Sequence, residues 1–388
     1  MFYYNKHQIT KSDITNVSKS LKSELITKGP FLKKFEEKIC EKFKSKYSLV
    51  TSNATSSFYI ISKVLNWGAN DNIIISPMTF VAAANSVVSA RAKPIFLDIS
   101  EKDKILDPTL VEKKIKEFKK RKKKISAIIV TDYAGTPADW KKFKKIKKKY
   151  GITLINDNCH AIGSEYYNDI GYATKYADIV IHSYHPVKNI TSGEGGSILT
   201  NNKKIYNNCL IIREHGFYRK KNHNSWEREI SKSGYNSRLS ELNCALGYSQ
   251  LSRLREIVLK RQKMAFLYDD YFNNHKFIKI MKLNFYAKSS YHLYCLTLDF
   301  KLLKINKSKF FNYIKKNFGI ILQVHYIPTY RFNLFRKFVK KKDIKKNFYN
   351  TEKYYNETFS IPLYLDLSKK NISYVCNAIE KTLAFMKK

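Results

Sequence analysis

Residues 177–196 read ADIVIHSYHPVKNITSGEGG, and the prediction of the fold starts from this stretch. It opens with an apolar run, passes Ser183 and Lys188, and ends in a glycine-rich turn over residues 193–196. The apolar run predicts a buried strand, so Lys188 follows the carboxyl end of that strand. A lysine placed there is partly removed from water, which lowers its pKa and frees the amine to form an imine. The alternative interpretation is a surface lysine, the commonest fate of a lysine in this chain.

Similar runs recur through the first two-thirds of the chain, alternating with helical patterns. Their apolar residues are continuous, which is typical of a parallel sheet covered by helices on both faces. The expected strands are 47–52, 72–77, 93–99, 125–133, 152–158, 177–184 and 196–201. Ligands of such sheets bind beyond the carboxyl ends of the strands, so we expect the functional site there.

An amphipathic stretch from about Ser240 to Phe272 predicts a long helix after this sheet. We expect a large domain over residues 1–250 and a smaller C-terminal α+β domain over residues 251–388, which includes the connecting helix. The smaller domain is predicted to contain strands near 291–299 and 320–328 and helices around 307–317 and 369–387.

The formal net charge of +40 is typical of proteins that bind nucleic acid or anionic membranes. The lysines, however, fill the exposed faces of amphipathic helices. In residues 139–155, Trp140, Phe143, Ile146 and Tyr150 recur at helical spacing and form one apolar stripe between lysines. We therefore expect no specific nucleic-acid partner and no membrane partner, and we interpret the charge as compositional drift that also attracts anionic substrates.

The cysteines and the apolar runs indicate the compartment. Six cysteines are scattered without a CxxC pair or a zinc-site spacing, so we expect free thiols and no metal. No apolar run reaches the roughly 20 residues that span a bilayer. The first residues also lack the apolar core of a signal peptide. We expect a cytoplasmic protein.

Two further segments bring polar groups to strand ends. In TSNATSSFYIIS (51–62), Thr55 and Ser56 open an apolar helix, whose free N–H groups favour a phosphate. An ordinary Ser/Thr helix cap explains the same residues equally well. In TLINDNCHAIG (153–163), Asp157 follows an apolar strand, where a carboxylate needs a partner such as the cationic ring nitrogen of a cofactor. His160 would lie beside that ring; the alternative is an Asp that caps the next turn.

This ordered set of phosphate cradle, carboxylate and imine-forming lysine resembles the pyridoxal 5'-phosphate (PLP) enzymes of the aspartate-aminotransferase fold. Over nearly its whole length, the chain is similar to the DegT/StrS-type sugar aminotransferases. The segments that carry this resemblance are LITKGPFLKKFEEKI (25–39), SNATSS (52–57), NDNCHAIGSEY (156–166), SYHPVKNITSGEGGSILTN (183–201), GYNSRLSELNCALGYSQLSRL (234–254) and VHYIPTY (324–330). Details such as SYHPVKNIT and YHLYCL resemble the members that act in pseudaminic acid biosynthesis.

The resemblance implies PLP fold type I, a mostly parallel central sheet flanked by helices, and a homodimer with shared active sites. It implies that Lys188 carries the cofactor imine, that Asp157 holds the ring nitrogen and that Phe80 stacks on the ring. The implied cofactor-binding residues are Thr55, Ser56, Phe80, Asp157, His160, Ser183, Lys188 and Asn236, of which Asn236 reaches the cofactor of the partner subunit. The implied substrate contacts are Tyr4, His185, Arg238 and His325.

The implied reaction is transamination, with glutamate as amino donor and a UDP-linked 4-keto-6-deoxy-N-acetyl-altrosamine as acceptor, for a surface-glycan sugar. Two alternatives remain open at this stage. The same chemistry could act on another UDP-, dTDP- or GDP-linked keto sugar, or the chain could be a basic binding protein on the same fold. Lys28 stands where the family often has Gln, in a segment that lies near the substrate in the family. This difference leaves the identity of the sugar undecided.

Overall fold

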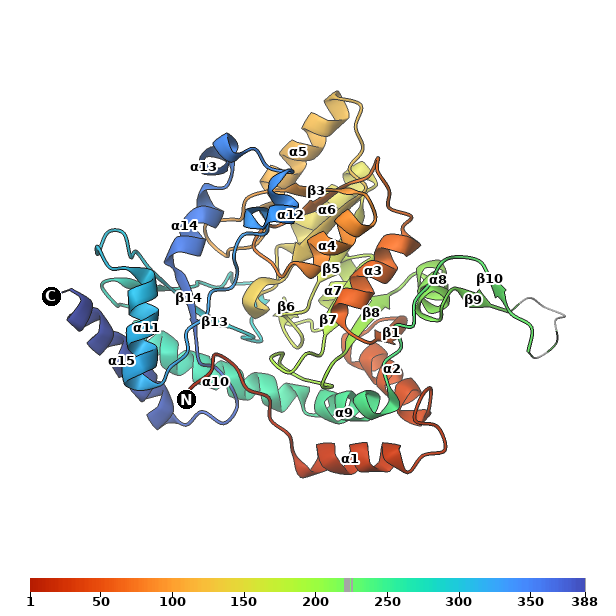
Figure 1. The fold of residues 1–388 in the computed structure, drawn as a ribbon, viewed down its shortest axis with the longest axis horizontal. Helices are drawn as coiled ribbons and strands as arrows, with labels where there is room; N and C mark the ends of the chain where they lie inside the picture. The colour runs from red at the N-terminus through yellow and green to blue at the C-terminus, as the bar shows by residue number, and fades with distance from the viewer. Residues whose placement is uncertain (220–223, 225, 388) are drawn as a thin grey trace.

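The structure, a computed structural model, describes residues 1–219, 224 and 226–387. Its largest sheet has seven strands in the order β1-β8-β7-β5-β4-β2-β3 (Figure 1). These strands are β1 Tyr47–Thr51, β2 Asn72–Ile75, β3 Lys93–Phe96, β4 Ala127–Thr131, β5 Thr153–Asp157, β7 Ile179–Ser183 and β8 Gly196–Thr200. Neighbours pair in parallel from β7 to β3, whereas β8 runs antiparallel to β7 and β1. The mostly parallel sheet predicted from the sequence is confirmed.

Continuous apolar strands form here because alternate residues enter two different hydrophobic cores. In β4, Ile128 and Val130 join one core, whereas Ala127 and Ile129 join the other. The first core is closed by α2 Pro30–Phe43, α5 Pro108–Lys120 and α6 Trp140–Tyr150, and the second by α3 Ala54–Val64, α4 Ala82–Ser89 and α8 Lys203–Arg213. Helices therefore cover both faces of the sheet, as expected.

Helix α6 shows how the lysine-rich segments fold. Trp140, Phe143 and Ile146 are buried, and the lysines between them lie on the outer side. Asp139 caps the first turn, and Gly151 ends the helix in a left-handed conformation. The predicted apolar stripe is confirmed. Within the described ranges, no helix is long and apolar enough to cross a membrane.

The rest of the chain forms a second group of elements beside the large sheet (Figure 1). Helices α9 Glu241–Ser252 and α10 Leu254–Phe272 run along one side, and α1 Lys11–Leu21 packs on α9. A three-stranded antiparallel sheet follows, in the order β11-β13-β14, with β11 Ile278–Ile280, β13 Tyr294–Leu298 and β14 Thr358–Ile361. Helices α11 Lys307–Phe318 and α15 Lys369–Met386 pack against each other beside it. The predicted domain division, between residues 250 and 251, falls near the end of α9 and stays a prediction.

The remaining short elements complete the chain. They are β6 Glu165–Tyr166, α7 Tyr172–Tyr176, β9 Phe217–Tyr218, β10 Glu229–Ile230, β12 Ala287–Lys288, α12 Asn333–Arg336, α13 Ile344–Asn347, α14 Tyr349–Glu357 and short 3-10 turns at Tyr133–Gly135, Thr329–Arg331 and Lys341–Asp343. The predicted strand over 320–328 is wrong, because this segment makes only isolated bridges, at Ile320 and Gln323. It runs along the cavity described below instead of joining a sheet edge.

Residues 2–5 cross from the second group of elements toward the large sheet. Phe2 forms a parallel bridge with Ile320, and the carbonyl of Tyr4 accepts a 3.0 Å hydrogen bond from the backbone of Leu363. The Asn5 side chain then donates to the carbonyl of Val187, the residue before Lys188. This segment therefore connects the C-terminal elements to the turn that follows β7.

Candidate active site

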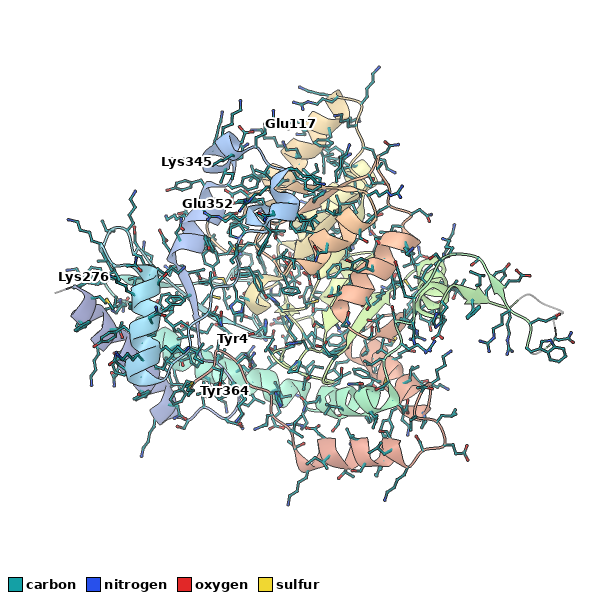
Figure 2. All side chains as sticks on the ribbon, in the orientation of Figure 1. Tyr4, Glu117, Lys276, Lys345, Glu352 and Tyr364 are labelled. Carbon is teal, nitrogen blue, oxygen red and sulfur yellow. The ribbon has the colours of Figure 1, made fainter. Side chains whose placement is uncertain are left out.

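A cavity of about 440 Å³ lies at the carboxyl ends of β5 and β7, where the sequence predicts the site. Figure 2 shows Tyr4, one of its lining residues, in the middle of the molecule between the two sheets. The predicted residues that line this cavity are Tyr4, Thr55, Phe80, Asp157, His160, Ser183, His185, Lys188 and His325. Ser56, Asn236 and Arg238 lie outside its lining.

Lys188 sits in a compact turn that the chain makes after β7. Its backbone N–H donates to the His185 carbonyl at 2.8 Å, and the N–H of Ser192 returns to the Tyr184 carbonyl at 2.9 Å. Burial lowers the pKa of the Lys188 amine, and the nearby negative charge of Asp157 partly opposes this shift. A larger fraction of the amine is therefore neutral and nucleophilic at physiological pH than for an exposed lysine.

Asp157 ends β5 with only 5% of its surface exposed. Its carboxylate accepts hydrogen bonds from the Thr131 hydroxyl at 3.0 Å, the Thr79 hydroxyl at 3.3 Å and the Cys159 backbone at 3.2 Å. It forms no ion pair of 4 Å or less with any residue that the structure describes. A buried carboxylate held by neutral donors, with no cation at ion-pair distance among the described residues, has room for a cationic ligand group.

The start of α3 forms the opposite wall of the cavity. The helix is capped by Asn53, whose side chain accepts a 2.8 Å hydrogen bond from the backbone of Ser56. The Ser56 hydroxyl lies 2.9 Å from that of Ser52, so in this structure Ser56 stabilises the cap, whereas Thr55 lines the cavity. A helix N-terminus beside a cavity favours an anionic group.

Gly196 lets β8 approach this helix start. A Cβ atom at position 196 would lie 2.5 Å from the backbone nitrogen of Ala54, closer than two such atoms can pack. Gly196, at the end of the lysine motif, thus has a steric function.

Three histidines and one tyrosine surround Lys188. Burial lowers the pKa of His325 to about 3, and it lowers the pKa values of His160 and His292 well below the usual range. All three imidazoles are therefore neutral at physiological pH, and the positive charge of Lys188 reinforces each shift. The His160 Nε2 atom lies 2.8 Å from the hydroxyl of Tyr326, and its ring lies 4.5 Å from that of His292.

Phe80 has an unusual position for an aromatic side chain. Its ring is 56% exposed although it lines the cavity, and the Tyr326 ring lies 6.2 Å away. An apolar ring left open at a cavity mouth provides a face on which a flat ligand can stack.

The lining or supporting residues that the sequence interpretation missed include Thr79, Thr131, His292 and Tyr326. Thr131 ends β4, the strand beside β5, so its position at a neighbouring strand end was a usable signal. Thr79 directly precedes Phe80, the residue that the family resemblance places on the cofactor ring, so its position in the sequence was a second usable signal. His292 and Tyr326 come from the second group of elements, and only its packing against the large sheet brings them to Lys188.

Asn236 and Arg238 lie beside a different cavity, of about 530 Å³, whose described lining includes Lys28, Glu214 and Arg238. Arg238 donates to Glu214 at 3.0 Å, and the Lys28 amine lies 2.6 Å from the same carboxylate. Asn236 forms an isolated backbone bridge with Glu214. Within one chain neither residue lines the cavity of Lys188. The predicted contact of Asn236 with the cofactor of a partner subunit and the predicted contact of Arg238 with the substrate both stay predictions.

Comparison with known proteins gives consistent results. A family model described as the DegT/DnrJ/EryC1/StrS aminotransferase family matches residues 7–380. A Campylobacter jejuni protein named UDP-4-amino-4,6-dideoxy-N-acetyl-beta-L-altrosamine transaminase is 34% identical over 391 residues, which cover 100% of this chain and 99% of the relative. A Helicobacter pylori protein of the same name is 31% identical over 389 residues, with 100% and 99% covered.

A solved structure extends the likeness to three dimensions. It is Helicobacter pylori PseC, described as an aminotransferase involved in the biosynthesis of pseudoaminic acid, with a TM-score of 0.89, 29% identity and 99% of both chains covered. The fold, the order of the motifs and the full-length matches therefore agree. The chain belongs to the DegT/DnrJ/EryC1/StrS aminotransferase family.

Proposed function

We propose that this protein uses PLP to transfer an amino group from glutamate to C4 of a UDP-linked 4-keto-6-deoxy-N-acetyl-altrosamine. The observation that carries the proposal is the desolvated amine of Lys188, which shares one cavity with the carboxylate of Asp157, a carboxylate without an ion pair among the described residues. The sugar is proposed because two full-length relatives are named as transaminases of the 4-amino product. The step would serve pseudaminic acid biosynthesis.

The lining of the cavity fits PLP group by group. The carboxylate of Asp157 suits a protonated ring nitrogen, and the open face of Phe80 suits the ring itself. The start of α3, with Thr55, and the hydroxyl of Ser183 suit the phosphate. When bound, PLP supplies an aldehyde and an electron-poor ring that stabilises a carbanion.

The protein side chains supply the remaining chemistry. The Lys188 amine would bind the cofactor aldehyde and then move a proton at the reacting carbon as general base and acid. The Asp157 carboxylate would keep the ring nitrogen protonated, through a charge-assisted hydrogen bond that stabilises by about 1.5–3 kcal/mol. The neutral imidazole of His325, 4.8 Å from the ring of Tyr4 between centroids, would contact the sugar from the C-terminal side.

Borohydride reduction tests the proposal directly. The purified protein incubated with PLP should absorb visible light, and after reduction the label should map to the peptide that contains Lys188. The Lys188→Ala variant should lose both signals and turnover, whereas Lys148→Ala, at an exposed lysine of α6, should keep them. A label on any other residue, or turnover by Lys188→Ala, would contradict the assignment.

The sugar needs a separate measurement. A panel of UDP-, dTDP- and GDP-linked keto sugars should be assayed with glutamate, and the UDP-linked altrosamine derivative should give the highest kcat/KM. A higher value for another sugar would keep the chemistry and replace the substrate. We also propose a homodimer with shared active sites, and we retain the predicted cytoplasmic location.

A further inference from the structure

The hydrogen-bonding direction of His160 can be assigned from its neighbours. The backbone N–H of Ala134 approaches the Nδ1 atom of His160 at 3.4 Å, and a backbone N–H can only donate. Nδ1 therefore accepts. Because burial keeps this imidazole neutral, its single N–H proton resides on Nε2.

This assignment fixes the role of the Tyr326 hydroxyl. The His160 Nε2 atom lies 2.8 Å from the Tyr326 oxygen, so Nε2–H donates and the Tyr326 oxygen accepts. The hydroxyl proton of Tyr326 must then point elsewhere. Burial raises the pKa of Tyr326 well above its usual range, so this proton stays in place at all physiological pH values.

No described residue accepts that proton. The bond with His160 is the one hydrogen bond of the Tyr326 hydroxyl in the described part of the chain. Tyr326 lines the same cavity as Asp157, Phe80 and Lys188. A half-buried hydroxyl that lines a cavity and has a directed, unused proton indicates a ligand acceptor.

Among the polar groups of PLP, one acceptor remains without a partner and is available to the Tyr326 hydroxyl. The protonated ring nitrogen is a donor and matches Asp157, and the phosphate matches the start of α3, with Thr55. The remaining polar group is the anionic ring oxygen beside the aldehyde carbon. We propose that Tyr326 donates its hydroxyl proton to this ring oxygen, and that His160 fixes the direction of the donation. The inference rests on the proposed cofactor.

The consequence is a change in the proton affinity of the cofactor imine. With PLP bound, a hydroxyl donor to the ring oxygen would stabilise that oxygen's negative charge and so favour the form of the imine that lacks a proton. Loss of the donor in Tyr326→Phe should therefore raise the imine proton affinity. A charge-assisted hydrogen bond corresponds to a change of about 10- to 100-fold, or an upward shift of about one to two pH units.

The test is a visible-absorbance pH titration of the PLP-loaded protein. Tyr326→Phe should show the upward shift, and Tyr4→Phe, a matched loss of one hydroxyl in the same cavity, should titrate like the wild type. Equal midpoints for the wild type and Tyr326→Phe, or a shift in Tyr4→Phe alone, would overturn the inference while the proposed function stands. A wild type without visible absorbance would overturn both.

A second measurement does not depend on the cofactor. In protein labelled with 15N-histidine and free of PLP, the His160 resonances, identified by their loss in His160→Gln, should show the neutral form with its proton on Nε2. A proton on Nδ1 would overturn the assigned direction. Because it needs no Tyr326 variant, this measurement can still overturn the inference if Tyr326→Phe fails to fold.

Discussion

The buried side chain of His182 should make the free energy of unfolding of the cofactor-free protein depend on pH. Its side chain lies in β7 with 1% of its surface exposed, against the ring of Phe43 at 4.6 Å between centroids. Its Nδ1 atom has no hydrogen-bond partner in the described part of the chain. Burial lowers the pKa of His182 from 6.5 to about 3. The folded state therefore keeps this imidazole neutral, whereas the unfolded chain binds a proton below about pH 6.5.

The sign and size of the effect follow from these two pKa values. The contribution of His182 is fully present above about pH 6.5 and is lost as the pH falls toward 3. pH 5 lies about 1.5 units below the pKa of His182 in the unfolded chain, so proton binding stabilises the unfolded state by about 2 kcal/mol relative to the folded state. His325, with its pKa also lowered to about 3, adds a similar loss. Together they remove about 4 kcal/mol, a large part of an ordinary folding free energy.

Urea unfolding at pH 7.5, 6.5, 5.5 and 5.0, followed by circular dichroism, measures this dependence. His182→Leu removes one titrating group, so the loss in free energy of unfolding between pH 7.5 and pH 5.0 should shrink by about 2 kcal/mol. The absolute stability of the variant does not affect this comparison. His7→Leu, at an exposed position, should keep the wild-type slope. An unchanged slope in His182→Leu would refute the reasoning.

Three further predictions concern the site. Asp157→Asn should still bind PLP but turn over about 10- to 100-fold more slowly in single-turnover assays, because the ring nitrogen loses its charged partner; unchanged rates would exclude that role. Mixing inactive Lys188→Ala with inactive Asn236→Ala subunits should restore part of the activity, and a mixture that stays inactive would count against shared sites. Gly196→Ala should weaken PLP binding in equilibrium titrations, because the new methyl group displaces the backbone at Ala54; wild-type affinity would show that this approach is not needed.

Most of the large sheet could be predicted because each strand carries its own signal. The run at 72–77 is apolar at every central position and became β2, Asn72–Ile75. In contrast, Thr358–Ile361 was not predicted as a strand. It is short, and it is a strand because it pairs with Tyr294–Leu298 more than 60 residues away, which no local pattern encodes.

For the same reason, the site residues that follow a locally encoded strand could be predicted from the sequence. Asp157, Ser183 and Lys188 could be placed because each follows a strand whose carboxyl end defines the site. His292 and Tyr326 could not, because they reach the cavity only after the C-terminal elements dock on the large sheet. Arg238 lines a different cavity, where it is paired with Glu214, and no pattern in the sequence encodes that pairing; its predicted substrate contact stays a prediction.

The path of residues 2–5 has a consequence for folding during synthesis. These residues leave the ribosome long before Ile320 and Leu363, so their contacts with those two residues exist only after more than 300 further residues have been made. Tyr4 can therefore enter the pocket only late, after the large sheet has been able to form. A nascent chain in which the turn that carries Lys188 has left the ribosome, but Ile320 and Leu363 have not, would expose the site with part of its wall missing.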